Sequence, residues 1–125
     1  MKSRIKTDSL IHPAKFKVIG FNNFESEIGE KTKPVLVLFI HWEGESQEQI
    51  GIIETLSNRY GEAIKMCLLE EEFIGPFSEK FGVKGSPTYL LFVRGQEKGR
   101  MLGRADLKTL QKFLLETVPS LGSGG

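Results

Sequence analysis

The chain has 125 residues, of which 39% are hydrophobic and 26% are charged, a balance that is ordinary for a globular domain and unlike that of a disordered chain. A chain of this length can bury one hydrophobic core but not two. The 17 basic and 16 acidic side chains leave a net charge of +1, so no overall field favours nucleic acid or a membrane as a partner, and no stretch approaches the roughly 20 apolar residues that cross a bilayer.

No repeat, low-complexity block or Pro/Gly/Ser-rich linker divides the sequence, so we expect a single domain over residues 15–118. An N-terminal arm over residues 1–14 precedes it, and a flexible tail rich in small residues follows over residues 119–125. The basic residues between Met1 and Lys17 are not followed by an apolar segment, so we expect no secretory signal and, by default, a cytoplasmic protein.

The first predicted elements are a short strand and a short helix. Residues 16–20 are a short, mostly apolar run that ends at a glycine, which is typical of a strand. Phe24 and Ile28 then lie four residues apart, which indicates one face of a helix, and Asn22 or Asn23 can cap its start.

Residues 34–40 are apolar without alternation, which is typical of a strand buried on both faces of a sheet. Ser46 and Gln49 then match a capping box, in which the two side chains each satisfy a backbone donor at the start of a helix. We expect this helix to end at Gly61. Its buried stripe consists of Ile50, Ile53, Leu56 and Tyr60.

The middle of the chain predicts a third strand and another helix. Apolar side chains alternate over residues 63–68, as in a strand, and the three glutamates at 70–72 are typical of a solvated turn. Pro76 suits the first turn of a helix that places Phe77 and Phe81 one turn apart.

The last third of the chain predicts a hairpin and a final helix. Residues 88–93 and a short strand near 100–103 flank a turn at 94–97, which favours an antiparallel pair. Asp106 can cap the final helix. The order βαβαβαββα predicts an α/β fold whose mixed sheet has helices on both faces. The final helix buries Leu107, Leu110 and Leu114.

Two segments of the chain resemble the thioredoxin family. The first is the apolar run over residues 34–40 followed by Trp42 and a helix, and the second is Gly85-Ser86-Pro87-Thr88 with the strand after it. Gly95, Gly103 and the helix from Asp106 continue the match, which covers residues 15–118. The resemblance implies a thioredoxin fold, a single three-layer α/β domain with a mixed central sheet flanked by helices.

The redox motif of that family is absent from this chain. Family members read Trp-Cys-Gly-Pro-Cys, whereas residues 42–46 read Trp-Glu-Gly-Glu-Ser. Glu43 replaces the attacking thiol and Ser46 the resolving thiol, and Leu38 stands where the family often has a buried acid. Because thiol–disulfide exchange runs through a thiolate and a mixed disulfide, neither replacement can perform it. We therefore reject a dithiol oxidoreductase.

The resemblance also implies a peptide-binding surface. In the family, the backbone of the residue before a cis-proline pairs with an extended peptide, beside the tryptophan. Carried over, this surface is formed by five residues together with the turn region over 100–103. The five are Trp42, Ser86, the cis-proline Pro87, Thr88 and Gly103. Such pairing needs backbone groups and an apolar floor rather than a thiol.

Other candidate chemistry is weaker. Cys67 is the only cysteine in the sequence, so it cannot form an intramolecular disulfide or a cysteine-rich zinc site, and as a free thiol in a strand it is expected to be buried and inert. His41 with Glu43 and Glu45 is too small a set for a structural metal site. Capping explains Ser46 better than a role as a nucleophile does. We expect no metal and no cofactor.

Three hypotheses follow for the function. The first is a redox-inactive, adaptor-like or chaperone-like module that binds a protein or an extended peptide around Trp42 and Pro87. The second is an oxidoreductase that uses Cys67 as a single thiol. The third is a subunit whose fold is retained for assembly. The sequence leaves the identity of the partner and the oligomeric state open.

Overall fold

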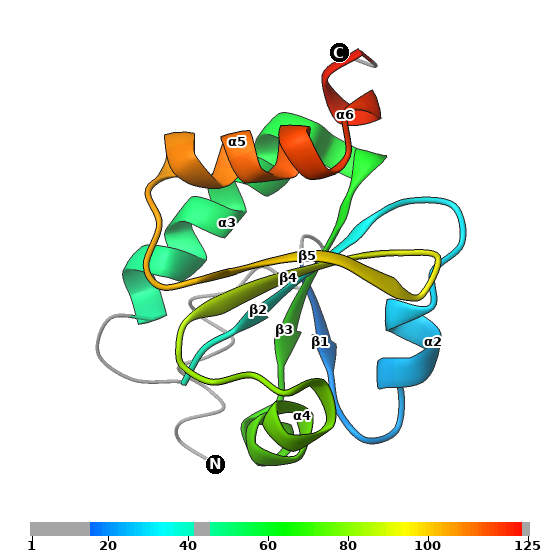
Figure 1. Cartoon of the computed structure of the whole chain (residues 1–125), viewed down its shortest axis with the longest axis vertical. Helices are drawn as coiled ribbons and strands as arrows, with labels where there is room; N and C mark the ends of the chain where they lie inside the picture. Colours follow the sequence, from blue (N-terminus) through cyan, green and yellow to red (C-terminus); the bar gives the residue numbers. More distant parts are fainter. Residues whose placement is uncertain (1–15, 42–45, 124–125) are drawn as a thin grey trace.

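A computed structural model describes residues 16–41 and 46–123, and it contains a five-stranded mixed sheet between two layers of helices (Figure 1). The elements in chain order are β1 (Phe16–Ile19), α2 (Phe24–Ile28), β2 (Val35–Phe39), α3 (Ser46–Tyr60), a 3₁₀ turn (Gly61–Ala63), β3 (Lys65–Leu69), a 3₁₀ turn (Glu71–Phe73), α4 (Ile74–Phe81), β4 (Thr88–Val93), β5 (Gln96–Leu102), α5 (Leu107–Thr117) and α6 (Ser120–Ser123). None of the helices in these two ranges is both long and apolar enough to cross a membrane.

The strands lie in the order β1-β3-β2-β4-β5. β1, β3 and β2 are parallel, β4 is antiparallel to β2, and β5 is antiparallel to β4. The predicted mixed sheet is therefore confirmed. Because β4 runs against β2, the start of β4 lies beside the end of β2, and Thr88 is opposite Phe39. This register brings the loop before β4 and the residues after β2 to the same end of the strands.

Two apolar clusters fill the space on either side of the sheet. Helices α3 and α5 cover one face, and α2 and α4 cover the other (Figure 1). Every residue of β2 is buried, as its unbroken apolar run predicts for a strand covered on both faces. The helices contribute the residues of their predicted stripes, including Ile53 and Leu56 from α3 and Phe77 from α4.

The hairpin differs from the prediction in its length. β5 begins at Gln96 rather than near Arg100, because the turn has only two residues between the strands. Arg94 and Gly95 have φ values of 55° and 80°, and a tight turn with two positive φ values matches the twist of paired strands. β5 is an edge strand with a polar first half, so its start carries no hydrophobic signal.

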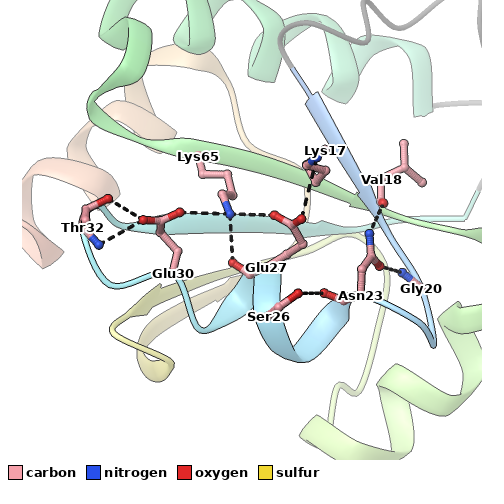
Figure 2. A network of polar contacts seen from close by, with 9 residues as sticks. All are labelled: Lys17, Val18, Gly20, Asn23, Ser26, Glu27, Glu30, Thr32 and Lys65. Carbon is pink, nitrogen blue, oxygen red and sulfur yellow. Dashed lines mark hydrogen bonds and ion pairs between the residues drawn. The ribbon is translucent and has the colours of Figure 1, made fainter.

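Two local predictions at chain turns also differ from the structure. Asn23 precedes α2 but makes no side-chain cap bond to it. Its amide instead accepts from the Gly20 N–H at 2.8 Å and donates to the Val18 carbonyl at 3.2 Å, which stabilises the exit from β1 (Figure 2). At the other end of the chain, residues 120–123 form α6 where we expected a flexible tail, because Leu121 packs against the core.

Candidate functional site

The site lies where the end of β2 meets the loop before β4. The backbone N–H of His41 donates to Ser86 Oγ at 3.3 Å, and this bond joins the residue before Trp42 to the residue before Pro87. Trp42 and Glu43 themselves lie outside the described residues, so their part of the predicted surface stays a prediction. The described part of the surface is the segment over residues 85–88 together with the end of β5.

The peptide bond between Ser86 and Pro87 is cis, the form that the resemblance implies. Three contacts hold this loop: Thr88 Oγ1 donates to the Gly85 carbonyl at 2.6 Å, the Gly103 N–H donates to the Pro87 carbonyl at 2.8 Å, and Ser86 accepts from His41. Pro87 and Thr88 are buried, whereas Ser86 is exposed. The fold therefore presents Ser86 to solvent on a loop that is fixed on both sides.

Leu102 adds an exposed apolar side chain beside this loop. It is 63% exposed and pairs with Thr88 across the hairpin. The position of a Cβ on Gly85 would lie 3.2 Å from Leu102 Cδ1, so the leucine covers the backbone of the loop. Gly103 has a φ of +105°, a conformation that favours glycine, and it turns the chain directly after Leu102. Sequence reasoning included the turn region but did not single out Leu102, whose signal was an apolar residue in a polar edge strand.

Ser46 is the first residue of α3, so the position of the family's resolving thiol lies at a helix N-terminus. The unpaired N–H groups and the positive end of the dipole at such a terminus favour negative charge. Glu48 lies in this first turn and forms an ion pair with Arg104. Because both side chains are more than half exposed, this ion pair contributes little to stability.

The glutamine half of the predicted capping box is wrong, because Gln49 points into the core. Its side chain is 1% exposed and bonds to Ala105 and Tyr89 rather than to the start of its own helix. Gln49 lies four residues before Ile53 and seven before Leu56, on the buried stripe of α3. The helical spacing of Gln49 therefore predicts that it is buried, although the short motif predicts a capping residue.

Cys67 is a buried free thiol in the middle of strand β3. It is 1% exposed and lies in β3 between Lys17 of β1 and Val37 of β2. Burial raises the pKa of the Cys67 thiol to about 12. A thiol with such a pKa is protonated at neutral pH and is a poor nucleophile.

Lys65, the basic residue nearest to Cys67 in sequence, lowers the pKa of the thiol by less than burial raises it. The hydrogen bonds of its ammonium group go to Glu27 and Glu30. Lys65 Nζ lies 2.7 Å from Glu27 Oε1 and 3.2 Å from Glu30 Oε1, and it also donates to the Glu27 carbonyl at 3.3 Å (Figure 2). Hydrogen bonds from Thr32 and Lys65 lower the pKa of Glu30 to about 2, with Thr32 the larger cause. The cluster ties α2 and the loop after it to the start of β3.

No group of three or more histidine, cysteine or acidic side chains is placed to hold a metal ion among residues 16–41 and 46–123. Glu43 and Glu45, two of the three side chains weighed as metal ligands, fall outside those ranges. His41 is exposed, and its ring packs edge-on against Phe39 with the ring centroids 5.9 Å apart.

Comparison of the sequence with known proteins identifies the family of the chain. A sequence model described as Thioredoxin matches residues 15–116. The chain belongs to the thioredoxin family. It is 30% identical over 97 residues to the protein named chloroplastic thioredoxin X of Arabidopsis thaliana, which covers 77% of this chain and 53% of that protein. It is 26% identical over 97 residues to the thioredoxin of Rickettsia typhi, which covers 77% of this chain and 92% of that protein.

A longer relative aligns over only part of its length. Protein disulfide isomerase-like 2-2 of Oryza sativa subsp. japonica is 30% identical over 108 residues, which cover 83% of this chain and 29% of that protein. The chain thus spans about half of the plant thioredoxin X and under a third of the isomerase-like protein.

Within the thioredoxin family, this chain is distinguished by its thiol content. Its single cysteine lies in β3, and Ser46 occupies the first turn of α3 where the family's motif places a cysteine. The loop before β4 has the family's Gly-x-Pro-Thr motif and its cis-proline. The fold and the proline loop are therefore present without the pair of thiols.

Proposed function

We propose that this protein binds an extended peptide or protein segment and performs no dithiol chemistry. The binding surface consists of Ser86, Pro87, Thr88, Leu102 and Gly103, together with Trp42, and is called the Ser86 surface below. The observation that carries the proposal is the exposed residue Ser86, directly before the cis-proline, near the exposed side chain of Leu102. The role is that of an adaptor or a chaperone.

The chemistry of the surface supports an extended peptide as the ligand. Family resemblance assigns backbone pairing to the residue before the cis-proline, which is Ser86. Backbone pairing gives affinity without sequence specificity, and a neighbouring apolar surface selects side chains. Leu102 offers such a surface, because it is 63% exposed and lies against the loop of Gly85.

The absence of redox chemistry is proposed from the thiol content. The sequence has one cysteine, and two thiols are needed to form and resolve a mixed disulfide within one chain. A single-thiol reaction at Cys67 is disfavoured by its burial in β3 and its raised pKa. Glu43 and Ser46 can neither attack nor form a disulfide.

The test uses reduced, carboxymethylated α-lactalbumin, an unfolded polypeptide without free thiols, as the ligand. We expect saturable binding by fluorescence anisotropy and, in hydrogen exchange of the complex, slower exchange of the backbone amide at Ser86. Leu102→Asp should weaken binding about tenfold, because it removes about 1.4 kcal/mol of apolar contact.

The matched control is Phe21→Asp, which also places a charge at an exposed apolar position. Phe21 is 61% exposed and follows β1, at the opposite edge of the sheet from β5. This variant should bind like the wild type. Equal loss in both variants, or no protection at Ser86, would contradict the proposed surface. Reduction of insulin disulfides by the pure protein with dithiothreitol, at a rate above that of dithiothreitol alone, would contradict the absence of redox chemistry.

A further inference from the structure

One buried amide joins the three segments that surround the Ser86 surface. Gln49 Nε2 donates to the Ala105 carbonyl at 3.3 Å, and Gln49 Oε1 accepts from the Ala105 N–H, also at 3.3 Å. The hydroxyl of Tyr89 donates to the same Oε1. Gln49 belongs to the first turn of α3, Tyr89 to β4, and Ala105 to the segment between β5 and α5.

Two of the residues in these contacts lie close in sequence to the surface. Tyr89 is two residues after Pro87, and Ala105 is two residues after Gly103, whose N–H donates to the Pro87 carbonyl at 2.8 Å. Gln49 is 1% exposed and Tyr89 is fully buried. In the part of the chain that the structure describes, no buried side-chain nitrogen or oxygen lacks a hydrogen-bond partner.

A polar cluster of this kind is specific in a way that apolar packing is not. Apolar contacts are non-directional, whereas a buried amide that loses its partners is left with unsatisfied groups. The two bonds from Gln49 to the N–H and the C=O of Ala105 therefore fix the position of Ala105 relative to α3. Burial raises the pKa of Tyr89, so its hydroxyl remains protonated and can donate at any ordinary pH.

We propose that Gln49 is a positioning residue for the Ser86 surface: it holds the Gly103–Ala105 segment and β4 at a fixed separation from α3. This inference rests on the proposed peptide binding, which it deepens. Glu48 and Arg104 connect the same two segments one residue away, but their exposed ion pair is screened by solvent. The buried amide is the contact that sets the geometry.

The test separates positioning from folding with a pair of variants. Tyr89→Phe removes one hydrogen bond and leaves both bonds between Gln49 and Ala105. Gln49→Leu combined with Tyr89→Phe removes the whole cluster and replaces it with apolar groups of similar size, which avoids an unsatisfied buried hydroxyl. Gln49→Met with Tyr89→Phe provides a second, more flexible replacement if the leucine variant does not fold.

Hydrogen exchange at the Ala105 amide is measured first, without any ligand. In the double variant, we expect exchange at the Ala105 amide to speed up at least tenfold more than exchange at the β2 amides, which report global unfolding. Tyr89→Phe should show no such change. Binding of carboxymethylated α-lactalbumin should then weaken about tenfold in the double variant and remain unchanged in Tyr89→Phe.

Unchanged exchange at Ala105 in a folded double variant would overturn the inference, and so would faster exchange with unchanged binding. If the wild type does not bind the unfolded polypeptide, the proposed function fails, and the positioning role in peptide binding fails with it. Exchange at Ala105 would then still show whether Gln49 holds the segment. The two failures are thus distinguishable.

Discussion

The burial of Cys67 predicts a thiol that does not react while the protein is folded. In native buffer at pH 8, we expect 5,5′-dithiobis(2-nitrobenzoic acid) to leave Cys67 unmodified over minutes. In 6 M guanidinium chloride, the same protein should release one equivalent of chromophore within seconds. This experiment decides against or in favour of the single-thiol oxidoreductase, because that activity requires a reactive Cys67.

The expected slowing of Cys67 labelling in the native protein follows from two independent barriers, the low ionised fraction of the thiol and its burial. With a pKa of about 12, about one thiol in 10,000 is ionised at pH 8, against about one in four for an exposed cysteine with a pKa of about 8.5. The more basic thiolate is about 40-fold more nucleophilic, so reaction in place would be about 60-fold slower than that of an exposed thiol. Reaction through opening is limited by the opening equilibrium, which for a cost of about 5 kcal/mol slows labelling about 5,000-fold.

The position of the thiol in the sheet makes the second barrier the relevant one. Cys67 lies in β3 with β1 paired on one side and β2 on the other, so access requires separation of the sheet or of the helices that cover it. Labelling of the native protein at a rate close to that in guanidinium chloride would refute this reasoning. The Cys67→Ala variant, which has no thiol, provides the baseline.

Three further predictions concern stability, each measured by urea denaturation. Above pH 9, the thiol of Cys67 loses its proton in the unfolded chain but keeps it in the native protein up to about pH 12, so the stability of the wild type falls as pH rises. The stability difference between wild type and Cys67→Ala should therefore shrink by about 1.4 kcal/mol per pH unit between pH 9 and 11. A difference that stays constant over this range would contradict the raised pKa. Lys65→Met removes the cation that Glu27 and Glu30 share and leaves Glu27 with Lys17 at 3.7 Å. It should lower the free energy of unfolding by about 1 kcal/mol, whereas the exposed Lys31→Met should change it little. Equal effects would exclude a special role for the cluster. Gly51→Ala places a methyl group in open space on α3 and should raise the free energy of unfolding by up to about 1 kcal/mol. Gly95→Ala, at a φ of +80°, should lower it by about 1 kcal/mol. A change of the same sign in both variants would be inconsistent with the turn geometry.

The fold was predictable because most of its elements have a strong hydrophobic pattern. The run of β2 predicted a strand covered on both faces, and the spacing in α3 and α5 predicted their buried stripes. Elements with little apolar content were harder. The start of β5 is polar and lies at an edge, and the short helix α6 contributes Leu121 to the core.

The candidate site was predictable in its position but not in its internal contacts. The Gly-x-Pro-Thr motif located Ser86 and Pro87, and the resemblance supplied the cis form of the proline. The orientation of Gln49 was missed because Ser46 and Gln49 match a cap motif of four residues, whereas burial is decided by the whole helix face. Asn23 was missed for a similar reason: a local motif suits a cap, but the backbone groups at the end of β1 were the available partners.

The proline loop of this protein is held by three hydrogen bonds of its own. The proline loop is fixed by Thr88, by the N–H of Gly103 and by the N–H of His41, none of which involves the side chains at residues 43 and 46. These three bonds therefore do not depend on the residues that stand in place of the family's thiols. At the start of α3, the helix dipole that would lower the pKa of a thiol favours a carboxylate equally well. The proposed peptide binding therefore needs the loop that these bonds hold and does not need the two thiols.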